Sequence, residues 1–276
     1  MDSVDSRSGS SLWVPASRSG PADRSGHIPL SFQQEFLRLV DKGDQAGPFG
    51  PRYTIVGGWR LRGPLDLPAL RAAFADLVVR HEALRTTIVR STTEAYQVVH
   101  LPREPEFQVW DLASSGPGHR DGRAEEFLNE LGATTVDAGE VPQLRAVLGR
   151  FDQRDAVLVL AAHHTAVDGW SIQVLMRDLA SLYSARRRGF QADLPPARQY
   201  QEYVAWQRAN AADPAVVAAK EYWRGRLDGA RVLPVRTDRP RRPDDPGSVT
   251  SWYRFLIPDE LRTATTELAS QLRSST

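Results

Sequence analysis

Two adjacent histidines, His163 and His164, stand at the end of an apolar run and are followed closely by Asp168 and Gly169. Histidine is the side chain whose ordinary pKa suits proton transfer near neutral pH. Because successive residues of a strand point to opposite faces, at most one of the two imidazoles faces a given site. The pattern therefore predicts one proton-transfer histidine, mounted rigidly at the end of a strand.

The residues after the two histidines predict a short turn and the start of a helix. Asp168 can bind a partner arginine or fix the turn, and Gly169 permits backbone conformations that other residues resist. A helix that begins near Trp170 or Ser171 would direct free N–H groups toward the same region. Such groups can stabilise negative charge that develops during a reaction.

The residue types alone leave other interpretations open. His163 can be structural, and His164 can be a hydrogen-bonded loop residue with no chemistry. A metal site needs more ligands, and the other histidines are scattered at positions 27, 81, 100 and 119. The chain has no cysteine, which excludes disulfides, cysteine-bound metals and a thiol nucleophile. We expect neither a metal nor a bound cofactor.

The composition is that of an ordinary globular protein. The 276 residues are 41% hydrophobic and 25% charged, and the net charge of +1 argues against a protein that mainly binds nucleic acid. The longest apolar run, residues 156–162, is too short to cross a bilayer, and the N-terminus lacks a secretory core. We therefore expect a soluble, cytoplasmic protein without a membrane partner.

Hydrophobic periodicity predicts a mixed α/β chain. Strands are expected at residues 53–61, 85–89, 95–100, 144–148, 156–162 and 252–257. Helices are expected after Ser31, from residue 66, and at residues 124–134, 171–188, 199–227 and 258–272, with a break near residues 213–214. Residues 1–27 are polar and predict a flexible leader, and residues 236–247 predict an extended connection.

Several segments, taken together, resemble one family. Residues 163–169 read HHTAVDG, residues 80–86 read RHEALRT, and residues 200–206 read YQEYVAW. They are similar to the HHxxxDG, RHExLRT and YxDYxxW motifs of the condensation domains of nonribosomal peptide synthetases, with Glu202 where aspartate is usual. Residues 30–34 resemble the opening motif of that family. Other acyltransferases share HHxxxDG, but the three motifs in this order are specific to condensation domains.

This resemblance implies a fold of the chloramphenicol-acetyltransferase type, which has two similar α/β lobes. Residues 28–195 would form the N-terminal lobe, a mixed sheet with helices. Residues 196–276 would form only the beginning of the C-terminal lobe, so the second lobe is expected to be incomplete. A separate chain that supplies the missing part is then one expected partner.

The resemblance also implies an activity. Condensation domains join a carrier-bound acyl thioester to a carrier-bound aminoacyl acceptor through an amide bond, and the substrates arrive on the phosphopantetheine arms of peptidyl carrier proteins. Two alternatives are acyl transfer to a free amine or alcohol, and a noncatalytic module that docks carrier proteins.

The catalytic centre implied by the resemblance comprises His163, His164, Asp168 and Gly169. His164 would assist the acceptor amine, while His163 would pack or bond beneath the loop. Asp168 would form a structural ion pair with Arg80 or Arg85, and a backbone N–H at or near Gly169 would stabilise the oxyanion.

Overall fold

The computed structural model describes residues 27–41, 47–91, 93–113, 116–231 and 257–275. The chain divides into two units, residues 1–222 and 223–276, and each is described by itself. Almost all of the predicted leader, the connection at residues 236–247 and nearly all of the strand predicted at residues 252–257 lie outside the described residues.

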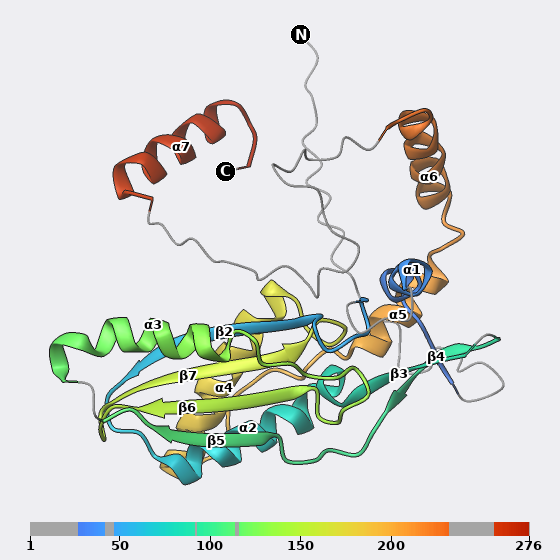
Figure 1. Cartoon of the computed structure of the whole chain (residues 1–276). Coiled ribbons are helices and arrows are strands. Elements are labelled where there is room, and N and C mark those ends of the chain that lie inside the picture. Colours follow the sequence, from blue (N-terminus) through green and yellow to red (C-terminus); the bar gives the residue numbers. More distant parts are fainter. Residues whose placement is uncertain (1–26, 42–46, 92, 114–115, 232–256, 276) are drawn as a thin grey trace, which may run out of the picture. The chain divides into compact units, whose positions relative to one another are not determined.

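The order of the elements is mixed α/β, as predicted (Figure 1). In chain order they are β1 (Ile28–Pro29), α1 (Phe32–Val40), β2 (Thr54–Arg62), α2 (Leu67–Arg80), the 3₁₀ helix η1 (Glu82–Arg85), β3 (Thr86–Arg90), β4 (Ala95–Val99), β5 (Glu106–Asp111), the 3₁₀ helix η2 (Pro117–His119), α3 (Arg120–Leu131), β6 (Leu144–Arg150), β7 (Asp155–His163), α4 (Gly169–Arg188), α5 (Tyr200–Ala209), α6 (Pro214–Leu227) and α7 (Asp259–Gln271).

The main sheet of the first unit has four strands in the order β2-β7-β6-β5. Strand β7 pairs antiparallel with β2 and β6, whereas β5 pairs parallel with β6. Three of these strands were predicted, but β5 was missed. Of its six residues only Phe107 is buried, so this edge strand lacks the apolar pattern that marks the others.

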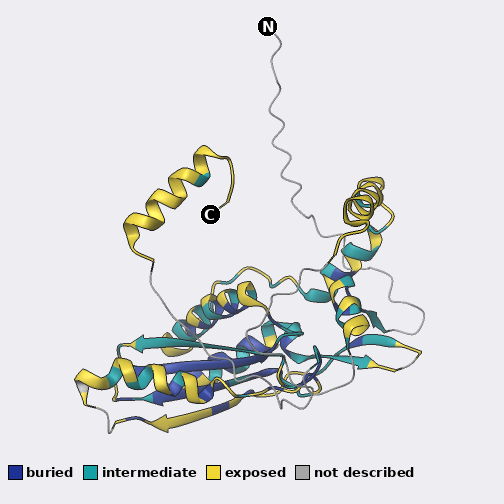
Figure 2. Cartoon of the chain, turned by 45° about the horizontal axis from the view of Figure 1, so that its top comes forward, coloured by how far each residue is buried: buried dark blue, intermediate teal, exposed yellow. Residues whose placement is uncertain are grey.

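Strand β7 is buried on both faces because helices cover both sides of the sheet (Figures 1 and 2). Ala156, Leu158 and Leu160 belong to the core beneath α2 and α4. Val157 and Val159 belong to the core beneath α3. This alternation explains why a strand with antiparallel neighbours carries a continuous apolar run, a pattern more common in parallel sheets.

Helix α4 has clear signals at both ends. The Asp168 side chain caps its N-terminus by accepting a hydrogen bond from the backbone of Ser171. Gly189 ends it in the left-handed conformation, with φ of 72°, and the N–H groups of Gly189 and Phe190 return to the Ala185 carbonyl. Glycine adopts that conformation at little cost, which explains the predicted end of the helix.

The second sheet of the first unit has the order β1-β4-β3. Ser31 then starts α1 with a capping box formed with Gln34. The predicted break in the later helix is confirmed, because α5 ends at Ala209 and α6 begins at Pro214. The helix expected at residues 124–134 instead spans Arg120–Leu131.

Helix α5 contacts the predicted N-terminal lobe. The Phe32 N–H donates to Gln207, and the Arg208 guanidinium donates to the Leu30 carbonyl. The division between lobes at residue 195 stays a prediction. None of the helices in the described residues is long and apolar enough to span a membrane.

Gly149 of β6 offers a test of the packing between the sheet and α3. A Cβ at this position would lie 2.6 Å from Leu112 Cδ1 and 2.7 Å from Phe127 Cε1. We expect Gly149→Ala to lower the free energy of unfolding by about 1–3 kcal/mol through overpacking, as measured by urea denaturation.

Gly122→Ala is the matched control. A Cβ at this position in α3 meets nothing within 4 Å. Alanine is the better helix former, so stability should be unchanged or slightly higher. Equal losses in the two variants would contradict the close packing at Gly149.

Candidate functional site

The position of His164 follows from the pairing of β7 with β2. The register places Thr54 opposite His163 and Ile55 opposite Ala162. Continued by one residue, it places Tyr53 opposite His164, and the His164 N–H donates to the Tyr53 carbonyl at 2.8 Å. Because side chains alternate between faces, His164 lies on the face of Ala162, which is the side covered by α2 and α4.

The His164 ring is held by an aromatic contact. It is partly buried and stacks on the Tyr53 ring, with 4.6 Å between the ring centroids and an interplanar angle of 19°. Within the described residues neither ring nitrogen of His164 has a hydrogen-bond partner. Both nitrogens are therefore available for proton transfer or for a hydrogen bond to a reacting group.

His163 points to the other face and has a different environment. Its ring is fully buried, and Nε2 lies 3.1 Å from the Gly50 carbonyl oxygen. A carbonyl only accepts, so Nε2 carries the proton and Nδ1 accepts from Thr165, whose Oγ1 lies at 2.7 Å. Burial lowers the pKa of His163, which keeps the ring neutral. The ring is thus sealed away from any reacting atom, and His163 supports the loop.

Asp168 acts as the cap of α4. Its Oδ1 accepts from the Ser171 N–H at 2.7 Å and from the Ser171 hydroxyl at 2.6 Å. These hydrogen bonds lower the pKa of Asp168; partial burial opposes the effect and the charge of His164 adds to it. The carboxylate therefore fixes the turn between the strand end and the helix.

The predicted ion pair of Asp168 with Arg80 or Arg85 is wrong. Arg80 Nε instead donates to Asp178 Oδ2 at 2.8 Å, and Arg85 pairs with Glu82 at 3.3 Å. Asp178 is ten residues beyond Asp168, which is about 15 Å along the helix axis. The end of α2 therefore reaches the middle of α4 and not its N-terminus.

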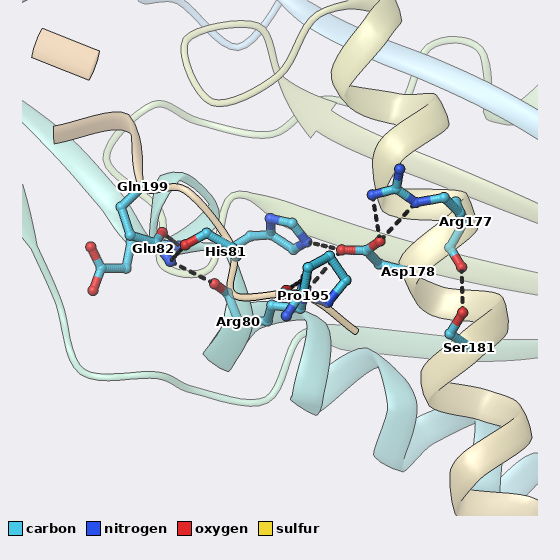
Figure 3. Close-up of polar contacts among 9 residues, drawn as sticks. Arg80, His81, Glu82, Arg177, Asp178, Ser181, Pro195 and Gln199 are labelled. Atoms are coloured by element: carbon cyan, nitrogen blue, oxygen red, sulfur yellow. Dashed lines mark hydrogen bonds and ion pairs between the residues drawn. The ribbon is translucent and has the colours of Figure 1, made fainter. Parts of the chain in front are cut away.

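Asp178 is the centre of a buried charge cluster (Figure 3). Its side chain is 1% exposed and accepts from Arg80, from His81 Nε2 at 2.9 Å and from Arg177 at 2.9 Å. Burial opposes ionisation of Asp178, but hydrogen bonds from the three donors outweigh it and lower its pKa. Burial also lowers the pKa of His81, so His81 donates as a neutral ring.

The family motifs meet through α5. The Tyr200 hydroxyl donates to Ser31 Oγ at 2.8 Å, and Gln201 donates to Glu82 at 2.7 Å. The Glu82 N–H donates in turn to Gln199 at 3.1 Å. Burial raises the pKa of Tyr200, and the nearby charge of Asp168 adds to the rise. The opening motif, RHEALRT, YQEYVAW and the histidine loop are thus close neighbours.

Gly169 differs from expectation. Its φ is not positive, so it does not require the conformational freedom of glycine. A Cβ at this position would meet nothing within 4 Å. Gly169 is the first residue of α4, and within the described residues its N–H forms no hydrogen bond. The open space and the available N–H are its distinguishing features.

Two further features bear on the chemistry that the chain can support. Among the described residues no group of three or more histidine, aspartate or glutamate side chains is arranged to hold a metal ion. A groove of about 590 Å³ lies between α2, the C-terminal half of α4 and the segment that leads to α5. Arg80, Arg186 and Phe190 line it, but no residue of the histidine loop does.

Comparison with known proteins identifies the family. The model of the Condensation domain family matches residues 24–275. The chain belongs to the condensation-domain family. Members of this family are acyltransferases that form peptide bonds.

The relatives include curated peptide synthetases. A linear gramicidin synthase of Brevibacillus parabrevis is 34% identical over 257 residues, which are 90% of this chain and 5% of that protein. The probable noncanonical synthetase CymA of Salinispora arenicola is 40% identical over 229 residues, which are 80% of this chain and 3% of that protein. The chain therefore spans a small part of these relatives.

A solved structure is more similar in length. SgcC5 of Streptomyces globisporus, crystallised with (R)-(-)-1-(2-naphthyl)-1,2-ethanediol and sucrose, is 46% identical with a TM-score of 0.80. The match covers 90% of this chain and 56% of SgcC5. The chain thus spans just over half of that protein, and the condensation fold predicted from sequence is confirmed over this part.

Two residues near the site were not singled out from sequence. Tyr53 was the first residue of a predicted strand, and the pairing of this strand with residues 156–162 would have placed it beside His164. Asp178 lies three residues after Leu175, at the spacing of the buried stripe of α4. An acid at such a spacing predicts a buried partner of opposite charge.

The two lowered histidine pKa values predict how stability depends on pH. Burial lowers the pKa of His81 and of His163 below the ordinary 6.5, so the unfolded chain binds more protons near that pH. The free energy of unfolding should be fully developed above pH 6.5 and fall as the pH drops below it. Urea denaturation between about pH 5 and pH 8 measures this slope.

Two substitutions assign the effect. His81→Gln can still donate to Asp178 but does not titrate, so its stability should fall less steeply toward low pH. His119→Gln changes an exposed histidine and should keep the slope of the unaltered chain. A slope unchanged in His81→Gln would contradict the assignment of His81.

The capping role of Asp168 gives a second prediction. Asp168→Ala removes the acceptor for the Ser171 N–H and should lower the free energy of unfolding by about 1 kcal/mol. Asp168→Asn keeps an acceptor and should retain most of that stability, as measured by urea denaturation. If both variants lose equally, the negative charge and not the cap is what matters at this position.

Proposed function

We propose that this chain provides the acyl-transfer centre of nonribosomal peptide condensation. The reaction joins a carrier-bound acyl thioester to a carrier-bound aminoacyl acceptor. The observation that carries the proposal is the His164 ring, which is partly buried at the end of β7 with both nitrogens unbonded within the described residues. Membership of the condensation-domain family supports it.

The proposed reaction needs one proton acceptor and no protein nucleophile. The acceptor amine attacks the thioester carbonyl, a C–N bond forms and the C–S bond breaks. A nitrogen of His164 orients the amine or accepts its proton, which ends on the departing pantetheine sulfur. Alignment of two tethered reactants contributes much of the acceleration, and fixed geometry can supply about 7–11 kcal/mol in favourable cases.

The N-terminus of α4 supplies the proposed oxyanion donor. Asp168 already occupies the Ser171 N–H, while the Gly169 N–H remains available within the described residues. A donor of this kind contributes about 3 kcal/mol to transition-state stabilisation where its removal has been measured. The open space over the Gly169 Cα suits the approach of a thioester.

The proposed partners follow from the same reaction. Peptidyl carrier proteins deliver both substrates on phosphopantetheine arms, and the chain itself binds no cofactor. A further polypeptide segment would complete the second lobe, since the match covers 56% of SgcC5. We place the reaction in the cytoplasm, and we expect neither a nucleic acid nor a membrane as partner.

Acyl transfer to a free alcohol or amine is the second candidate. SgcC5, with 46% identity, was crystallised with a diol, which carries two hydroxyl groups. An alcohol can replace the amine with the same role for His164. The third candidate is a noncatalytic module that docks carrier proteins, and the assay below separates all three.

Replacement of His164 by alanine tests the proposed chemistry. We expect transfer from an acyl-loaded carrier to an aminoacyl-loaded carrier to fall at least about 100-fold, because general acid–base catalysis contributes about 10²–10⁴-fold. Intact-protein mass spectrometry follows the mass of both carriers. The melting temperature should change little, since no ring nitrogen of His164 is bonded within the described residues.

His119→Ala is the control and should transfer at the rate of the unaltered chain. Transfer only to a free alcohol or amine would favour the second candidate. Carrier binding without transfer to any acceptor would favour the docking module. Equal rates with and without His164 would remove this residue from the mechanism.

A further inference from the structure

Tyr53 stands beside the proposed catalytic histidine in a position that the strand register fixes. The two residues are cross-strand neighbours one step beyond the Thr54–His163 pair. Facing residues of an antiparallel pair have Cβ atoms about 4.5–5.5 Å apart, which brings aromatic rings into contact. The stacking of Tyr53 on His164, at 4.6 Å and 19°, is the contact observed for the His164 ring.

The backbone around Tyr53 is held from several directions. The Tyr53 N–H donates to the Gly50 carbonyl at 2.9 Å, and the same carbonyl accepts from buried His163. The Thr54 hydroxyl donates to the Pro51 carbonyl at 2.6 Å and accepts from the Val136 N–H at 2.9 Å. Rigid support of this kind lets a side chain hold its neighbour in one geometry.

The His164 ring has no other restraint of comparable direction. Catalytic histidines are commonly oriented by a hydrogen bond to the second ring nitrogen. Within the part of the chain that the structure describes, His164 makes no such bond. Asp168, the nearby carboxylate, has its Oδ1 occupied by Ser171. A stacked ring therefore takes the place of the usual hydrogen-bonded partner.

We propose that Tyr53 is a positioning residue for His164, and that its ring face sets the orientation of the imidazole. The hydroxyl of Tyr53 forms no hydrogen bond within the described residues, so the aromatic face carries the effect. The catalytic consequence rests on the proposed function, whereas the orientation of the ring does not. His163 contributes indirectly, because it holds the Gly50 carbonyl to which Tyr53 is bonded.

The first test is spectroscopic and needs no activity. The chain has six histidines, so selective isotopic labelling gives a simple spectrum, and the signal missing in His164→Ala assigns the ring. Ring protons stacked over an aromatic face are shifted upfield. We expect this shift for His164 in the unaltered chain and in Tyr53→Phe, and its loss in Tyr53→Leu.

Tyr96→Leu is the matched control. It removes a second tyrosine–histidine stack, that of Tyr96 with His27 at 3.7 Å. The signals of His164 should not change in this variant. An unshifted His164 signal in the unaltered chain, or a shifted one that persists in Tyr53→Leu, would overturn the proposal.

The second test measures transfer between loaded carriers by the full chain. Tyr53→Leu should lower kcat by up to about tenfold with little change in KM, and Tyr53→Phe should restore the rate. Loss of the upfield shift with no change in kcat would overturn the positioning role. An upfield shift in a chain that transfers nothing would instead refute the proposed function and leave the orientation of His164 by Tyr53 standing.

Discussion

The pairing of β2 with β7 is the constraint on which the site depends. It sets Thr54 against His163 and Tyr53 against His164, and so sends the two imidazoles to opposite faces of the sheet. A slip of one residue would exchange the faces and bury His164 instead. The apolar residues of β7 prevent such a slip, because each face of the strand fills a different core.

The two faces then give adjacent, identical residues opposite properties. On the α3 side His163 is sealed, neutral and bonded to a backbone carbonyl. On the α4 side His164 stays partly exposed at the start of a helix that Asp168 caps. The first histidine therefore supports the backbone that presents the second, through Gly50 and Tyr53. Chemistry and support are divided by the alternation of the strand.

Much of this could be predicted from the sequence. The apolar run of β7, the stripe and glycine of α4 and the motif residues identify the elements, the family and the histidine loop. Periodicity could not reveal β5, whose exposed side chains carry little apolar signal. It also could not reveal the stack of Tyr53, which depends on pairing between segments about 110 residues apart. Local patterns specify elements, whereas register and packing specify neighbours.

The error over Asp168 has an instructive physical cause. An exposed carboxylate at a helix N-terminus is satisfied by N–H and hydroxyl donors, so it needs no arginine. A carboxylate buried to 1% has no such freedom, and Asp178 accordingly has two guanidinium partners and an imidazole. Arg80 follows the buried charge, because desolvation makes that partnership the more necessary one. The RHEALRT segment therefore stabilises the packing of α2 on α4, and through Gln199 and Glu82 it fixes the start of α5, rather than shaping the histidine loop directly.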